Sequence, residues 1–171
     1  MAKHCCIVIY SNSQLLEEAL VALQAAGCDL GQASVVARAC QAKGQPLGIY
    51  HIDDCVHFLG QQRIFGGRLT GSGFFWEPDF GPLMASGPIV NIMVRGLEDV
   101  DIGAGFSLLG AALFSVGVPR GIICEYERMI RAEKFLLLFH GEWQDVEHVC
   151  SVLHVDTQQV TVHCAQGDFA K

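Results

Sequence analysis

Positive charge is scarce in this chain. Lys and Arg number 11 among 171 residues, against 18 Asp and Glu, and the formal net charge is −7. Proteins that bind nucleic acid or anionic membranes carry basic patches that face the phosphates. We therefore expect neither DNA nor RNA as a partner, and no attraction to a charged lipid surface.

Catalytic signatures are also missing. The sequence has no Walker A motif and no Gly-x-Ser-x-Gly elbow. Gly71-Ser-Gly73 lacks the third glycine of a dinucleotide fingerprint, and no strand is predicted before it. Glu125, Tyr126 and Glu127 offer acid–base groups, but helical spacing turns Tyr126 toward the core and favours a structural role. We assign no catalytic residue and no cofactor, and we do not expect an enzyme.

The eight cysteines do not form a recognisable framework. No Cys-x-x-Cys occurs, and no spacing matches a zinc ribbon. We expect no secretory leader before the strand-like segment that begins at Cys5. We therefore expect reduced thiols in a cytoplasmic protein.

No hydrophobic run is long enough for a clear membrane span. The longest, from Ile102 to Val118, has 17 residues. As a helix rising ~1.5 Å per residue, it just misses the roughly 30 Å of a bilayer core. We favour a soluble helical hairpin, and the alternative is a membrane-associated protein that inserts residues 102–118.

Glycine, in contrast, is concentrated in one region. Twelve of the 19 glycines lie between Gly60 and Gly117. Gly103, Gly110 and Gly117 recur at a seven-residue step, which returns to nearly the same face of a helix. Such a face lets a second helix pack closely, from the same chain or from another copy. The spacing predicts helix packing at these three glycines and a homo-oligomer.

The first part of the chain predicts a strand, a helix and a second strand. Cys5–Tyr10 is apolar on both faces, as in an inner strand. A helix follows, with a capping box that begins at Ser11 and a left-handed glycine, Gly27, at its end. The second strand falls within residues 32–39, and we expect it to form a hairpin with residues 47–52.

The last part of the chain repeats this order. The predicted elements are a helix after Pro119, a buried strand over Phe135–Phe139, a helix over residues 142–154 and a closing strand over Val160–Cys164. Strand, helix, strand, an insertion, then strand, helix, strand is the split βαβ order of ferredoxin-like folds. The first and third strands are central there, and they are the two unbroken apolar runs.

We therefore expect an α+β fold with a ferredoxin-like antiparallel sheet in a single domain. The core comprises residues 1–52 and 134–171. A glycine-rich, mostly helical insertion, residues 53–133, separates the second and third core strands.

Several segments in a fixed order resemble the bacterial general stress protein family, which includes small heat-induced stress proteins. They are Gly81-Pro-Leu-Met-Ala-Ser-Gly-Pro-Ile89, the glycine-stepped run, Gly117-Val-Pro119 followed by Tyr126-Glu127, and Phe135-Leu-Leu-Leu-Phe-His-Gly141. The resemblance spans residues 66–141. It implies a stress-associated bacterial protein with no assigned reaction. Trp76-Glu-Pro-Asp79, Arg95 and Glu98-Asp-Val-Asp101 depart from it by placing charges in a usually apolar stretch.

One end of the predicted sheet gathers metal-binding residue types. The last strand of a ferredoxin-like sheet lies antiparallel to the first, which places His163 and Cys164 near His4 and Cys5. Imidazole and thiolate together suit zinc. The alternative, which we favour, is that the cysteines are core residues and the histidines lie at the edge.

Two further clusters are considered for metal binding. His51-Ile-Asp-Asp-Cys-Val-His57 matches no established zinc spacing, and Asp53 is well placed to cap a helix. Glu98, Asp99 and Asp101 do not complete a calcium loop, so we expect a solvated turn. We assign no metal, and a metal- or small-molecule-binding regulatory module of ferredoxin-like type is the alternative function.

Overall fold

The computed structural model describes residues 4–38, 69, 72–77, 81–98, 107–153 and 160–163. Its strands are β1 (His4–Tyr10), β2 (Ala33–Arg38), β3 (Ser72–Glu77), β4 (Gly81–Ser86), β5 (Phe135–Gly141) and β6 (Val160–His163). Its helices are α1 (Ser13–Ala25), α2 (Ile89–Glu98), α3 (Leu108–Ser115), α4 (Ile123–Arg131) and α5 (Trp143–Leu153). The six strands form one sheet in the order β3-β4-β2-β5-β1-β6, and every neighbouring pair is antiparallel. The prediction of an α+β fold is confirmed.

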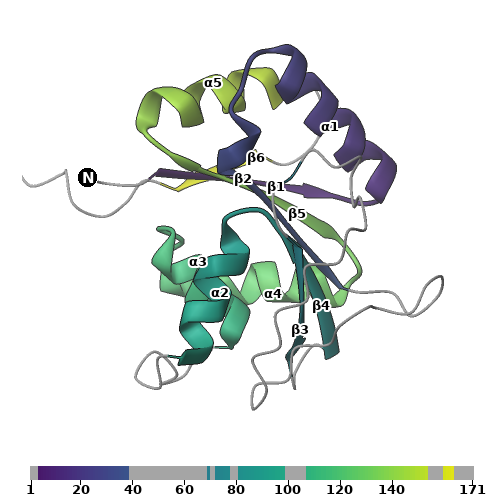
Figure 1. Cartoon of the computed structure of the whole chain (residues 1–171), viewed down its shortest axis with the longest axis vertical. Helices are drawn as coiled ribbons and strands as arrows, with labels where there is room; N and C mark the ends of the chain where they lie inside the picture. Colours follow the sequence, from purple (N-terminus) through teal and green to yellow (C-terminus); the bar gives the residue numbers. More distant parts are fainter. Residues whose placement is uncertain are drawn as a thin grey trace, which may run out of the picture.

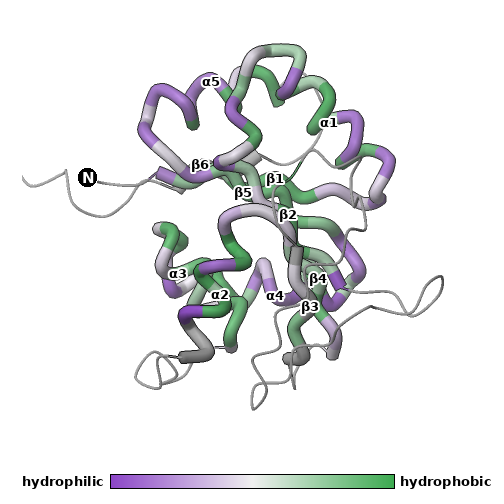
Figure 2. The backbone as a smooth tube through the Cα atoms, viewed as in Figure 1, coloured by the Kyte–Doolittle hydropathy of each residue, from purple (hydrophilic) through white to green (hydrophobic). Residues whose placement is uncertain are grey.

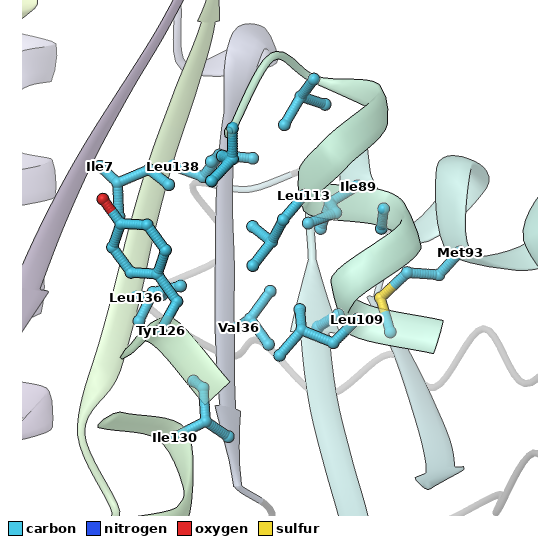
Figure 3. Close-up of a cluster of buried hydrophobic side chains, with 14 of the residues drawn as sticks. Ile7, Val36, Ile89, Met93, Leu109, Leu113, Tyr126, Ile130, Leu136 and Leu138 are labelled. Atoms are coloured by element: carbon cyan, nitrogen blue, oxygen red, sulfur yellow. The ribbon is translucent and has the colours of Figure 1, made fainter. Parts of the chain in front are cut away.

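The sheet separates two layers of helices. Helices α1 and α5 cover one face, and α2, α3 and α4 lie against the other (Figure 1). Successive side chains of a strand point to opposite faces, so β1 contributes to two cores. Cys5 and Ile7 join the core beneath α2–α4, while Cys6 and Val8 join the core beneath α1 and α5. Figure 3 shows the first of these cores, in which Leu109 and Leu113 of α3 approach Val36 of β2.

Strands β1 and β5 occupy inner positions, as their continuous apolar sequences predict. They pair over seven residues, from His4 opposite Gly141 to Tyr10 opposite Phe135. Hydrophobic residues dominate these strands, whereas hydrophilic residues recur along α1 and α5 (Figure 2). A strand covered on both faces has no polar side, which explains why both sequences lack alternation.

Helix α1 begins one residue later than predicted. Its N-cap is Asn12, whose side-chain oxygen accepts a hydrogen bond from the backbone N–H of Leu15 at 2.9 Å. The capping box expected to begin at Ser11 is therefore wrong in register. Asparagine is as strong an N-cap as serine, and the two residues are adjacent, so either fits the sequence.

The insertion, residues 53–133, contributes two strands, β3 and β4, that were not predicted from the sequence. β3 and β4 form a hairpin that extends the sheet beside β2. β2 pairs with β4 on one side and with β5 on the other. Both sides of β2 thus pair with other strands, and residues 47–52, its predicted hairpin partner, lie outside the described residues.

The 17-residue glycine-stepped run does not form one helix. Within it, α3 extends only from Leu108 to Ser115. None of the helices in the described residues is long and apolar enough to cross a bilayer.

Three helices end in the same left-handed turn. After α1, the N–H of Gly27 bonds to Gln24 and that of Cys28 to Leu23. The ends of α3 and α4 repeat these bonds, with Gly117 and Glu133 in the place of Gly27. This is the Schellman motif, which needs a positive φ and favours glycine. The φ values are 78° at Gly27, 106° at Gly117 and 62° at Glu133, so a side chain occupies the motif only after α4.

Replacing Glu133 with glycine should stabilise the fold by about 1 kcal/mol. A Cβ in the left-handed conformation costs about 1–2 kcal/mol, of which the extra freedom of glycine in the unfolded chain offsets a part. Thermal unfolding should show a rise in Tm of about 3 °C. Glu133→Ala is the control, because it removes the carboxylate near the helix C-terminus but keeps the Cβ. Equal shifts for the two variants would assign the effect to charge and contradict backbone strain.

Candidate functional site

The close packing predicted at Gly110 lies between two helices of one chain. Gly110 is buried in the first turn of α3. A Cβ built there would lie 3.1 Å from Ile123 Cγ2 and 3.1 Å from Glu127 Oε1, both on α4. Distances this short leave no room for a side chain unless the neighbours move. Glycine at this position lets α4 approach the backbone of α3.

Gly117, the last glycine of the predicted packing face, does not share this contact. Gly117 follows the end of α3 and adopts a positive φ, so it stops the helix instead of lining it. That part of the prediction is wrong, because a glycine at a seven-residue step also suits a C-terminal cap. Gly103 lies outside the described residues.

A polar contact holds the two helices together beside Gly110. Ser107 is the N-cap of α3, and its Oγ accepts a hydrogen bond from the N–H of Gly110 at 2.9 Å. The same hydroxyl donates to Glu127 Oε1 of α4 at 2.5 Å. A carboxylate near the N-terminus of α3 also interacts favourably with the helix dipole. Glu127 therefore has a structural partner in this contact.

The three neighbouring groups considered for acid–base chemistry point to different surroundings. Glu125 forms an exposed ion pair with Arg128 at 2.8 Å. Tyr126 is buried in the core beneath α2–α4 (Figure 3). Glu127 contacts Ser107. The geometry does not bring them to one reaction centre.

The first and last strands, β1 and β6, lie side by side in the sheet, as the sequence predicts. Cys5 of β1 lies opposite His163 of β6 and opposite His140 of β5. His4 and Cys5, however, are consecutive in a strand and point to opposite faces. The ring of His4 lies 5.3 Å from that of Trp143 on α5, while Cys5 lies in the core beneath α2–α4. These two residues cannot share an ion.

The described residues cover the remaining metal candidates only in part. Cys164, residues 51–57, Asp99 and Asp101 lie outside the described residues. Among the described residues, no group of three or more His, Cys, Asp or Glu is arranged to hold a metal ion. The candidates that include residues outside the described ranges stay predictions.

A pair of thiols, which the sequence analysis did not connect, meets between β1 and α5. The Cys150 thiol lies 3.0 Å from Cys6 Sγ and donates a hydrogen bond to it. The two side chains are 7% and 1% exposed. Both belong to the core beneath α1 and α5, where Val146 and Val149 of α5 also lie.

Each sulfur changes the acidity of the other. When Cys150 ionises, a hydrogen bond from the Cys6 thiol stabilises the thiolate and lowers the pKa of Cys150. The same interaction, together with burial, raises the pKa of Cys6. On the other face of the sheet, burial raises the pKa of Cys5. Cys150 is thus the sulfur of the pair that ionises first.

Comparison with known proteins does not add a function. No family model matches the chain, and neither a curated protein nor a solved structure is significantly similar to it. The residues themselves must carry the functional hypothesis.

Proposed function

We propose that this is a cytoplasmic, stress-associated bacterial protein that acts through self-association. The resemblance of Gly81–Ile89, Gly117–Pro119 and Phe135–Gly141 to the general stress protein family supports the biological context. A ferredoxin-like core is part of the proposal. The strand order β2-β5-β1-β6, with α1 and α5 on one face, supports it.

We propose that two copies meet at an edge of the sheet, because the close contact at Gly110 is already made within one chain. Gly110 faces α4 of its own chain, so a second copy has no access to it there. β6, in contrast, is the last strand of the sheet and pairs with β1 on one side. Among the described strands, none pairs with its other side.

The sequence of β6 suits pairing with another strand. Edge strands of monomers are commonly protected by charges, prolines or bulges. Val160-Thr-Val-His163 contains no Lys, Arg, Asp, Glu or Pro, and three of its four residues are β-branched. The opposite edge strand, β3, has three aromatic residues but also contains Gly73 and ends in Glu77, a charge of the kind that protects an edge strand. This composition is the observation that carries the choice of β6.

The occupant we propose is β6 of a second copy. Two identical strands related by a two-fold axis pair antiparallel, which gives the closed symmetry usual in homodimers. The two sheets would then join into one through main-chain hydrogen bonds.

Two proline variants test this contact. Successive N–H groups of an edge strand point alternately to its neighbour and to the open side, so Thr161→Pro and Val162→Pro remove different bonds. Size-exclusion chromatography with light scattering, without detergent, should give a dimer for the wild type. One variant should be a monomer with an almost unchanged Tm, while the other should lose thermal stability.

Two results would contradict the proposal. One is a wild-type protein that remains monomeric throughout a concentration series that extends to about 1 mM, where even weak specific pairing is populated. The other is a dimer that persists in both proline variants. Recovery of the protein only in detergent would favour the membrane-associated alternative.

A further inference from the structure

We propose that Cys6 and Cys150 are a redox modification site, at which a peroxide converts the two thiols into a reversible disulfide between β1 and α5. The proposal does not depend on self-association, because both cysteines belong to one chain.

Geometry is the main support. The two sulfurs are 3.0 Å apart, and a disulfide bond is about 2.05 Å long. A shift of about 1 Å between a strand and a packed helix, with small changes of rotamer, closes this gap. No rearrangement of the fold is needed to bring the sulfurs together.

The surroundings separate this pair from the other described cysteines. Cys5 is adjacent in sequence but lies in the core on the other face of the sheet. Cys28 is partly buried and Cys124 is exposed. Among the described cysteines, Cys6 and Cys150 are the two whose sulfurs are in hydrogen-bond contact.

The two thiols are suited to different steps. Cys150 is the more exposed of the two and is the one whose pKa is lowered, so its thiolate is the group that meets the oxidant. Cys6 lies deeper, at 1% exposure, and its sulfur is next to the site where the oxidised sulfur forms. Cys6 therefore attacks the oxidised sulfur of Cys150 and completes the disulfide.

The reaction balances with hydrogen peroxide as the oxidant. The Cys150 thiolate attacks one peroxide oxygen, the O–O bond breaks, and the hydroxide released takes up a proton to become water. The Cys6 sulfur then attacks the sulfenic sulfur of Cys150. The S–S bond forms, the S–O bond breaks, and hydroxide leaves as a second water with the proton from Cys6. Two thiols are oxidised and one peroxide is reduced to two waters, while a small dithiol reverses the change by exchange.

Peptide mapping tests the linkage in the full-length chain. Trypsin cuts after Lys3, Arg38 and Lys134, so Cys6 and Cys150 fall in peptides 4–38 and 135–171. The reduced protein is treated with hydrogen peroxide, blocked with iodoacetamide and digested. We expect these two peptides to be linked, and the link to disappear after treatment with a dithiol.

Matched variants and fragmentation assign the sulfurs. Each peptide also contains other cysteines, among them Cys5 and Cys164. The link should persist in Cys5→Ala and Cys164→Ala and be lost in Cys6→Ala and Cys150→Ala. Fragment ions of the linked wild-type peptides make the same assignment without a substitution, so a variant that fails to fold does not weaken the test.

Thermal unfolding gives an independent measurement. A bridge between residues 144 positions apart should raise the Tm of the oxidised wild-type protein by roughly 5–15 °C. Absence of the link under conditions that oxidise the exposed Cys124 would overturn the proposal. A link that maps to other cysteines, or persists in Cys6→Ala, would also overturn it.

Discussion

Replacing Gly87 with alanine should destabilise the protein by about 4 kcal/mol. Gly87 is buried between β4 and α2 and has a φ of 93°. A Cβ there would overlap the carbonyl oxygen of Ala33 and lie 2.8 Å from Ser34 Cα, both on β2. Left-handed strain contributes about 1–2 kcal/mol, and overlap with the backbone of β2 contributes about 1–3 kcal/mol.

The same contact positions a hydrogen bond that the variant should disturb. Ser34 is fully buried, and its Oγ accepts from the N–H of Ile89, at the start of α2, at 3.0 Å. If β2 moves away from a methyl group at residue 87, this bond lengthens and the N–H of Ile89 loses its partner. The midpoint of chemical denaturation should fall. Thermal unfolding should show a Tm that is lower by roughly 10 °C.

Substitutions at two other glycines distinguish the cost of a left-handed backbone from the cost of steric overlap. A Cβ at Gly27 meets nothing within 4 Å, but its φ is 78°, so Gly27→Ala should lose only about 1–2 kcal/mol. Gly121 has open space and no positive φ, so Gly121→Ala should change the free energy of unfolding by less than about 0.5 kcal/mol. Equal losses for Gly87→Ala and Gly27→Ala would show that Gly87 does not approach β2 as closely as described.

Replacing Gly110 with leucine should destabilise the protein by about 3 kcal/mol. The new side chain would have to fit where Ile123, Glu127 and Ser107 each lie 3.1 Å from the position of its Cβ. Forcing extra carbon atoms into a packed contact costs about 1–3 kcal/mol or more. Separation of α3 and α4 would also break the bond from Ser107 to Glu127.

The matched control is the same substitution at Gly121, where a Cβ has open space. Gly121→Leu should leave the Tm close to that of the wild type. Gly110→Ala should be nearly neutral, because about 1 kcal/mol of improved helix propensity offsets the tight contacts. An unchanged Tm in Gly110→Leu would contradict the close packing of α3 on α4.

The parts of the fold that the sequence predicted depend on local patterns. β1 and β5 were recognisable because strands buried on both faces have continuous apolar sequences. Gly27 was recognisable as a helix end because a left-handed cap has few alternatives to glycine. The α+β class followed from the order of these elements.

The parts that it missed depend on contacts between distant residues. The pairing of β2 with β4 cannot be read from either strand, since each sequence fits several partners. Gly117 has the same local signature in a packing face and in a helix cap, and only the length of α3 decides between them. Cys6 and Cys150 are 144 positions apart, and only the packing of α5 on the sheet reveals the pair. The helix predicted over residues 142–154, which contains Cys150, was the nearest available signal.

Self-association through β6 is the central hypothesis, and hydrogen exchange at two protein concentrations tests it most directly. At high concentration, the backbone amides of Val160–His163 should be protected, including those on the open side of the strand, and dilution should remove the protection from those outward amides. Amides of β1, an inner strand, should exchange equally slowly at both concentrations. Exchange at β6 that is independent of concentration, or concentration-dependent protection confined to β3, would contradict the proposed contact.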